Sequence, residues 1–203
     1  TEIPPIMLLP EKFALGSTTA KEMADFRTRR KNIDALKKSA ISKFTEEFPS
    51  LKGNFGKINY IEYSPSDNFI SILNSQNKLY LSNKSSLESK LISENALISS
   101  FSPDSKKIAF ITDKKEMVIY DLTAEKTAIL NIGATADSAL AWHKNSEYLF
   151  IKYSSDLYLL EGNDLPPINL QLISSGIEKY QYIQEKNVLY LLKGGSLYNL
   201  GRL

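Results

Sequence analysis

The residues that could do chemistry in this chain are few and scattered. His143 is the only histidine, and there is no cysteine, which excludes disulfides and thiolate metal ligands. Catalysis by His143 would need a nucleophile in an activating context and an acid to orient the ring, and the sequence has no Gly-x-Ser-x-Gly elbow. We therefore interpret His143 as a solvated polar residue of a turn, and we assign no catalytic residue and expect no enzymatic activity.

The acidic and glycine-rich segments give no stronger signal for a metal or cofactor. Asp104, Asp113 and Asp121 lie close together along the chain, and a structural calcium ion there is the alternative to ordinary turn acids. The spacing differs from that of an EF-hand, and there is no pair of histidines. Gly194-Gly195 separates two apolar segments, which favours a hairpin turn with positive φ over a phosphate-binding loop. We expect neither a metal nor a cofactor.

One segment has a distinctive charge. Apolar residues recur at helical spacing from about residue 20 to 47: Met23, Phe26, Ile33, Leu36, Ala40, Ile41, Phe44 and Phe48. The opposite face is predicted to carry the basic residues that form our candidate partner-binding surface: Arg27, Arg29, Arg30, Lys31, Lys37 and Lys38. Because acidic residues are interspersed, we interpret this face first as an ordinary solvated one; the alternative is contact with an acidic partner, an anionic membrane surface or RNA. No aromatic residues alternate with these bases, so stacking on nucleic-acid bases is not indicated.

The whole-chain composition is that of an ordinary globular protein. The 203 residues are 42% hydrophobic and 24% charged, with a net charge of +2 and a pI near 8.5, which is too balanced to indicate nucleic-acid binding. No apolar run reaches the roughly 18 residues of a membrane span. The first residue is Thr1, not Met, so we expect that a leader or an upstream region has been removed.

Residues 1–56 have a different pattern from the remainder. Ile6–Leu9 is a short apolar run bounded by Pro4-Pro5 and Pro10, which predicts an edge strand. Thr19 and Glu22 form a capping box at the start of an amphipathic helix, and Pro49 and Gly53 end it.

From residue 57 the pattern changes to short strands that repeat about every 40 residues. Leu79, Val118, Leu157 and Leu197 occupy the same position of successive units. Each unit has a strand, a polar turn, a second strand, another turn and a third strand, and three units show a fourth strand. Four short strands in about 40 residues is the pattern of a propeller blade. We place the blades at 57–93, 94–132, 133–174 and 175–203, and we expect Trp142 and the many tyrosines to pack between them.

The segment FSPDSKKIAF (residues 101–110), followed by the strand ending Tyr120-Asp121, resembles blades of TolB-type and WD-repeat propellers. An aromatic-Ser-Pro-Asp-Gly turn joins the first two strands in those families, and a Trp-Asp pair ends the third. Here Ser105 replaces the glycine, and the Gly-His pair of WD repeats is missing. The resemblance covers residues 57–203 and implies a mainly β fold, a propeller of about four blades with an N-terminal helical segment.

Three architectures are compatible with four blades. The chain is a fragment of a larger propeller, or a four-blade ring in which Ile6–Leu9 supplies the missing outer strand, or an open array docked on a partner. An incomplete propeller exposes an apolar blade face, which is unfavourable without a partner. We favour the fragment or the partnered array, with a copy of this chain or another chain completing the propeller.

The function expected from these patterns is a non-enzymatic scaffold for protein–protein interaction, because propeller motifs specify architecture and not activity. The resemblance to TolB implies a bacterial envelope or surface assembly, and therefore an extracytoplasmic location. One alternative is the accessory propeller of a prolyl oligopeptidase-like hydrolase. Another is a subunit of an intracellular assembly that docks through its basic helix, which salt-sensitive RNA binding would favour.

Overall fold

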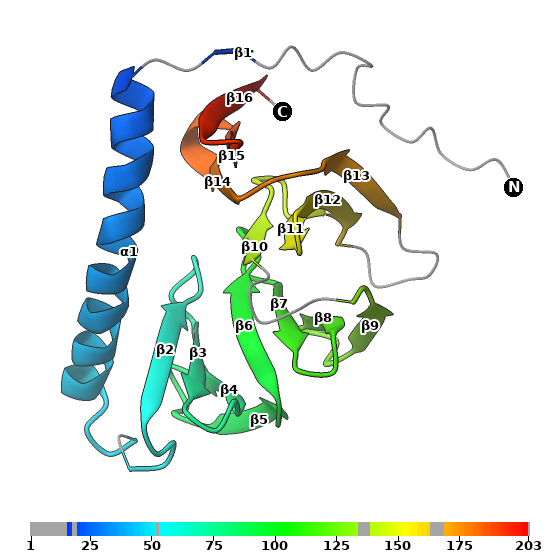
Figure 1. Ribbon diagram of the computed structural model, residues 1–203. Helices are drawn as coiled ribbons and strands as arrows, with labels where there is room; N and C mark the ends of the chain where they lie inside the picture. Colours follow the sequence, from blue (N-terminus) through cyan, green and yellow to red (C-terminus); the bar gives the residue numbers. More distant parts are fainter. Residues whose placement is uncertain (1–15, 18–19, 52, 134–138, 163–168, 203) are drawn as a thin grey trace, which may run out of the picture.

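The computed structural model describes residues 16–17, 20–51, 53–133, 139–162 and 169–202 (Figure 1). This part of the chain contains helix α1 (Ala20–Glu47), the 3-10 turn η1 (Gln184–Lys186) and four four-stranded antiparallel sheets. The sheets follow one another around an arc, and α1 lies beside the first of them. The predicted mainly β architecture of repeated antiparallel sheets with one helix is confirmed.

Each sheet is one blade, and its strands are ordered from the inside of the arc outwards. Blade 1 contains β2 (Ile58–Tyr63), β3 (Phe69–Asn74), β4 (Leu79–Asn83) and β5 (Ser89–Ser93). Blade 2 contains β6 (Ala96–Phe101), β7 (Lys107–Thr112), β8 (Glu116–Asp121) and β9 (Thr127–Asn131). Blade 3 contains β10 (Ala139–Trp142), β11 (Tyr148–Tyr153), β12 (Asp156–Glu161) and β13 (Leu170–Ser174).

Blade 4 takes its outer strand from the beginning of the chain. Its own strands are β14 (Lys179–Ile183), β15 (Val188–Lys193) and β16 (Ser196–Arg202), and β1 (Gly16–Ser17) pairs antiparallel with β16. The segment for which we predicted this role, Ile6–Leu9, lies outside the described residues, as do Thr19 and the Glu22 side chain of the predicted capping box. Gly194 and Gly195, at φ 57° and 72°, form the predicted hairpin turn between β15 and β16.

The turn between the first two strands links blade 2 to blade 1 and blade 3 to blade 2. Asp67, Ser105 and Ser146 occupy the same position of this turn, and all three have positive φ, at 59°, 59° and 63°. The hydroxyl of Ser105 accepts the N–H of Ser66 in blade 1 at 2.8 Å, and that of Ser146 accepts the N–H of Asp104 in blade 2 at 3.0 Å. We call these two contacts the turn ladder. They explain why serine replaces the glycine of the related turns, since glycine has no hydroxyl to offer.

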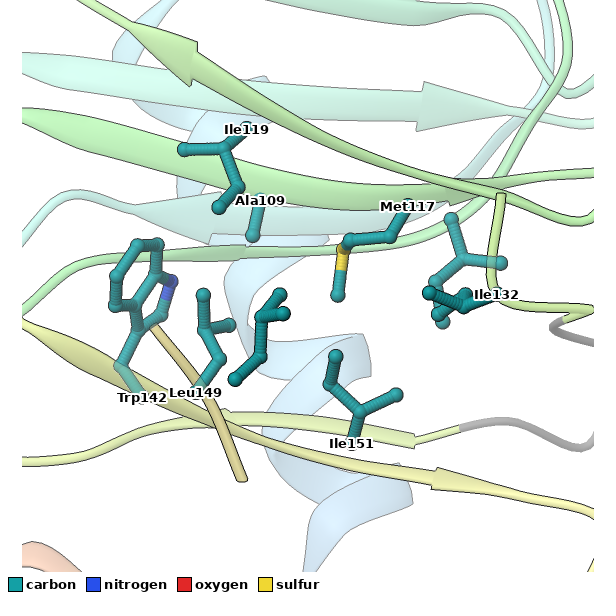
Figure 2. Close-up of a cluster of buried hydrophobic side chains, with 9 residues drawn as sticks. Ala109, Met117, Ile119, Ile132, Trp142, Leu149 and Ile151 are labelled. Carbon is teal, nitrogen blue, oxygen red and sulfur yellow. The ribbon is translucent and has the colours of Figure 1, made fainter. Parts of the chain in front are cut away.

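The blades adhere through apolar clusters between adjacent sheets. Figure 2 shows the cluster between blades 2 and 3, in which Met117 and Ile119 face Leu149 and Ile151. Trp142 is fully buried there, and its Nε1–H donates to the carbonyl of Ser100 at 2.9 Å. Trp142 therefore packs between blades, as predicted from the repeat.

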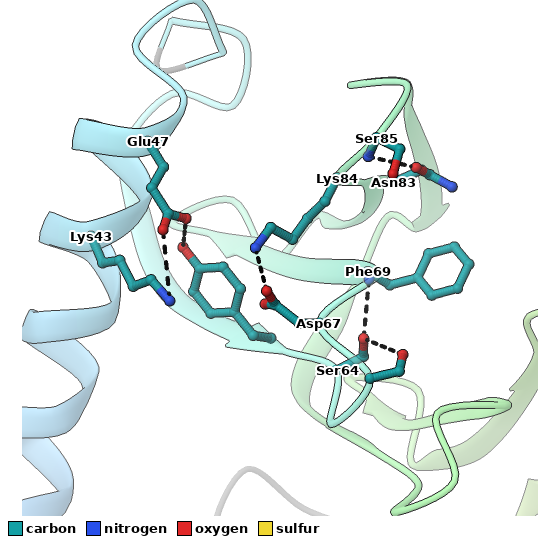
Figure 3. Close-up of polar contacts among 10 residues, drawn as sticks. Lys43, Glu47, Ser64, Asp67, Phe69, Asn83, Lys84 and Ser85 are labelled. Atoms are coloured by element: carbon teal, nitrogen blue, oxygen red, sulfur yellow. Dashed lines mark hydrogen bonds and ion pairs between the residues drawn. The ribbon is translucent and has the colours of Figure 1, made fainter.

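Helix α1 covers the face of blade 1 that no other blade contacts. Phe44 is completely buried against Ile61, Ile70 and Ile72 of β2 and β3. At the edge of this contact, Tyr63 donates a hydrogen bond to Glu47 at 3.3 Å, and Glu47 pairs with Lys43 at 3.7 Å (Figure 3). The C-terminal half of α1 thus occupies the place that a preceding blade would take, which removes most of the exposed apolar face expected for an open array.

Candidate interaction surface on helix α1 and strand β2

A groove opens where the middle of α1 rises away from blade 1. It is lined by Leu36, Lys37 and Ala40 of the helix and by Tyr60 and Ile61 of β2, and its volume is about 290 Å³. This lies at the low end of the range for small-molecule pockets. A space of this size suits one or two anchoring side chains.

The groove exists because the apolar stripe of α1 is not continuous. We predicted Leu36 on the buried face, but 67% of its surface is exposed. We also predicted Lys37 on the opposite, solvent face; it stands seven residues before the buried Phe44 and therefore on the same side of the helix. Its Nζ lies 5.5 Å from the centre of the Tyr60 ring, within reach of a cation–π interaction. Among its described side chains, the predicted amphipathic helix is thus apolar and buried at Phe26 and Phe44, and mixed at Leu36 and Lys37.

The six basic residues of the candidate surface all lie in α1, but only two have described side chains. Lys37 and Lys38 are exposed, and Lys37 lines the groove. The side chains of Arg27, Arg29, Arg30 and Lys31 lie outside the described part of the structure. The part of the predicted surface that can be placed is therefore the pair of lysines next to Leu36.

Behind Tyr60, the groove adjoins a buried carboxyl group. Burial raises the pKa of Glu62 on β2 from its ordinary value of 4.5 to about 8. The N–H of Phe101 and the hydroxyls of Ser100 and Tyr60 offset part of this rise. Burial and the charge of Glu62 also raise the pKa of Tyr60. Tyr60 therefore contacts both the open groove and the interior of the blade array.

Sequence analysis missed Glu62, although the repeat holds a signal for it. The corresponding positions of the other inner strands are Ser100, Ala141 and Tyr182. A single charged residue stands where the other blades have uncharged ones. In an inner strand covered on both sides, such a residue is expected to be buried and hence to have an unusual environment.

The structure places His143 far from this groove in the fold, in an aromatic cluster at the β10–β11 turn. Its ring stacks on Tyr182 at 5.6 Å between centroids, and it meets Tyr148 and Phe150 edge-on. Its Nδ1 lies 2.7 Å from the Asn145 side-chain oxygen. His143 is thus a partly exposed turn residue, as we interpreted it, and its ring also packs between blades 3 and 4.

The three aspartates considered for calcium stabilise separate turns. Asp104 accepts hydrogen bonds from Ser102 and from the N–H of Lys106, which suits an ordinary turn acid. Asp113 accepts a bond from Asn95, and Asp121 accepts the N–H groups of the β8–β9 turn. Within the described ranges, no three residues of the His, Cys, Asp or Glu types gather in a way that could hold a metal ion. Over those same ranges, no helix is long and apolar enough to cross a membrane.

Comparison with solved structures shows that the blades are those of TolB-like and WD-repeat-like propellers. TolB from Acinetobacter baumannii matches with a TM-score of 0.52 and 17% identity over 70% of this chain and 39% of TolB. The WD40 domain of SCAP from fission yeast matches with a TM-score of 0.51 and 14% identity, again over 70% of this chain and 39% of that one. This confirms the resemblance predicted from residues 57–203.

The same fold also occurs in an enzyme. Dihydro-haem d1 dehydrogenase NirN matches with a TM-score of 0.55 and 11% identity over 70% of this chain and 34% of its own. The chain spans less than half the length of these three propellers. No protein-family model matches the chain, and neither does any curated protein sequence. At these identities the comparisons define the fold, and a fold does not decide activity.

Proposed function

We propose that this chain is a non-catalytic β-propeller module that binds a protein partner through the groove between α1 and β2. The observation that carries the proposal is the position of Leu36. A large aliphatic side chain that is 67% exposed stands at the rim of an apolar groove, with the exposed Lys37 and Lys38 next to it. An apolar anchor site beside a polar rim is the general anatomy of protein interfaces.

The occupant that fits this surface is a partner segment that combines an apolar side chain with acidic residues. The groove offers Ala40, Ile61 and the Tyr60 ring to the apolar side chain. Lys37 and Lys38 offer positive charge to the acidic residues, and α1 carries five further basic residues in its N-terminal half. Complementary charge would speed the encounter and select partners, while the buried apolar anchor would supply most of the affinity.

The propeller supports such a role by holding the groove rigid. Phe44 fixes α1 on blade 1, and the turn ladder and the interblade clusters fix blade 1 on the rest of the array. A preorganised surface loses little conformational entropy on binding. We further propose a scaffold role in a bacterial envelope or surface assembly, which the TolB-like fold supports and which cell fractionation would test.

Site-specific photocrosslinking tests the groove directly. A photoreactive residue replaces Leu36 in cells that produce the native protein, and a second one replaces Ile129, which is 61% exposed on the outer strand of blade 2. We expect one predominant partner to crosslink from position 36 and not from position 129.

Binding of that partner, once purified, must then depend on the same residues. We expect Leu36→Asp and Lys37→Glu each to weaken binding at least tenfold, and the matched controls Ile129→Asp and Lys126→Glu to bind as the wild type does. Unchanged affinity in Leu36→Asp, with the thermal unfolding transition retained, would refute the assignment of the groove. Equal weakening by Ile129→Asp would refute it as well.

A further inference from the structure

The apolar interface between blades 1 and 2 contains a small polar cluster. Its apolar surroundings include Leu73, Phe101 and Phe110. Within them, Glu62 lies on β2, Ser71 on β3 and Ser99 on β6. Ser71 is fully buried and Ser99 is 3% exposed. We call Glu62, Ser71 and Ser99 the junction triad.

The strand registers place the three residues of the junction triad at the same interface. Glu62 and Ser71 are directly opposite in the β2–β3 pair, so they share one face of the sheet with Cβ atoms about 5 Å apart. Ser99 is opposite Phe110 in the β6–β7 pair, and Phe110 packs against blade 1. Ser99 therefore faces blade 1 as well, across the interface from Ser71 and Glu62.

All three members of the triad have an oxygen without a partner. Glu62 Oε2, Ser71 Oγ and Ser99 Oγ are inaccessible to solvent and make no hydrogen bond among the described residues. Other buried serines of the same blades are paired: Ser82 bonds to Ser89 at 2.7 Å, and Ser102 bonds to Asp104 at 2.7 Å. Buried polar atoms are nearly always satisfied. Among the described residues Gln181 Oε1 of blade 4 is also unpartnered, but only the interface between blades 1 and 2 has three such oxygens, which favours a ligand that the protein chain itself does not provide.

The chemistry of these oxygens indicates which ligand. A carboxylate and two hydroxyls form a set of hard oxygen donors, which suits cations that prefer oxygen. When Glu62 is ionised, the triad carries one negative charge, and the ion pairs of the described residues do not involve Glu62. One positive charge would therefore neutralise the site. We propose that the junction triad binds a single dehydrated alkali-metal cation, such as Na⁺ or K⁺, between blades 1 and 2.

A proton is the competing occupant of this site. Because burial raises the pKa of Glu62 to about 8, its carboxyl group binds a proton more readily than an ordinary glutamate does. A cation and a proton therefore compete for the same carboxyl group. Tyr60, whose hydroxyl is hydrogen-bonded to Glu62, is the other titratable group at this position. The groups that face Glu62 from β6 are the neutral Ser100 hydroxyl and the Phe101 N–H.

Thermal unfolding at pH 9 in chloride salts of equal ionic strength tests the proposal. We expect Na⁺ or K⁺ to raise the melting temperature in a saturable manner, by about 5 °C at saturation, relative to choline. Glu62→Gln removes the charge and keeps the shape, and should abolish this ion-specific shift. Glu88→Gln, at an exposed position of blade 1, should retain it. Ser99→Ala should weaken the response while leaving the protein folded.

Two results would overturn the proposal. One is an equal response to alkali ions and choline in the wild type, with a melting temperature that depends on pH alone; the site then holds only a proton. The other is an ion-specific shift that persists in Glu62→Gln, which would place the cation elsewhere. Broadening of the ²³Na resonance by wild-type protein, lost in Glu62→Gln, would provide a direct readout. The partner-binding groove is tested by different variants, so failure of one proposal leaves the other standing.

Discussion

The turn ladder makes a quantitative prediction at Ser105. Two opposing contributions to the stability of the folded protein act at this residue. A residue with a Cβ pays about 1 kcal/mol or more for a left-handed conformation that glycine adopts freely, and Ser105 has φ 59°. Its hydroxyl accepts the N–H of Ser66 at 2.8 Å, and such a bond contributes about 1 kcal/mol net. Replacing serine by alanine removes the bond and keeps the conformational cost, whereas glycine removes both.

We therefore expect the two substitutions to differ. Ser105→Ala should lower the free energy of unfolding by about 1–1.5 kcal/mol, and Ser105→Gly should stay within about 0.5 kcal/mol of the wild type. Ser154 provides a matched control: it has φ 53° and is exposed, and its hydroxyl makes no hydrogen bond within the described ranges. There, alanine should be nearly neutral and glycine should stabilise by about 0.5–1 kcal/mol.

Urea unfolding of the five proteins, with a shared slope for the denaturant dependence, measures these differences. The difference in the free energy of unfolding between the glycine and alanine variants should be similar at positions 105 and 154. At position 105, the lost hydrogen bond should make both variants less stable, relative to the wild type, than the corresponding variants at position 154. If Ser105→Gly stabilises the protein as much as Ser154→Gly does, the hydroxyl contributes nothing and the ladder does not explain the serine.

Three further perturbations follow from the packing and the charges. A Cβ added to Gly162 would lie 2.7 Å from Cζ3 of Trp142. Gly162→Ala should therefore lower the free energy of unfolding by about 1–3 kcal/mol and shift the Trp142 fluorescence. An unchanged stability would contradict the close contact between the ring and the glycine. Phe44→Ala should cost about 3–5 kcal/mol and loosen α1 from blade 1, seen as faster amide exchange in the helix, whereas an unaltered exchange rate would show that other contacts hold α1. In choline chloride, folding raises the pKa of Glu62 from 4.5 to about 8, so the folded state binds the proton more tightly than the unfolded state does. The stability that this proton contributes is complete below pH 4.5 and is lost as the pH rises to 8. Between pH 5 and 8, stability relative to Glu62→Gln should fall by up to about 1.4 kcal/mol per pH unit, and parallel pH profiles of the two proteins would contradict this.

Local periodicity was sufficient to predict the elements of this fold. The helix occupies Ala20–Glu47 as the spacing of its apolar residues indicated, and blades 1 to 3 have the predicted succession of short strands joined by turns. These features depend on neighbours a few residues apart, and they repeat from blade to blade. The donor of the outer strand of blade 4 was harder to predict, because any short segment with free backbone groups can pair with an edge.

The candidate site could be predicted only in part, because it depends on where the helix departs from the sheet. Leu36 fits the apolar spacing of α1 as well as Phe44 does, and only tertiary placement makes one exposed and the other buried. Lys37 was assigned to the outer face on its charge, although its spacing from Phe44 placed it on the inner one. For Glu62, the alternation of residues along the strand predicted which face of the sheet the side chain lies on. It did not predict that the other blades and α1 cover both faces of this inner strand.

The pairing of β1 with β16 has a consequence for the time course of folding. Gly16 is opposite Asn199, so about 180 residues separate the partners of this contact. Such a long separation makes the pairing slow to form. During synthesis, blades 1 to 3 have all their strands before β16 leaves the ribosome, and residues 16–17 must wait until the last sheet exists. Completion of blade 4 is therefore expected to be the final event, so that an unpaired edge of β16 marks a chain that has not finished folding.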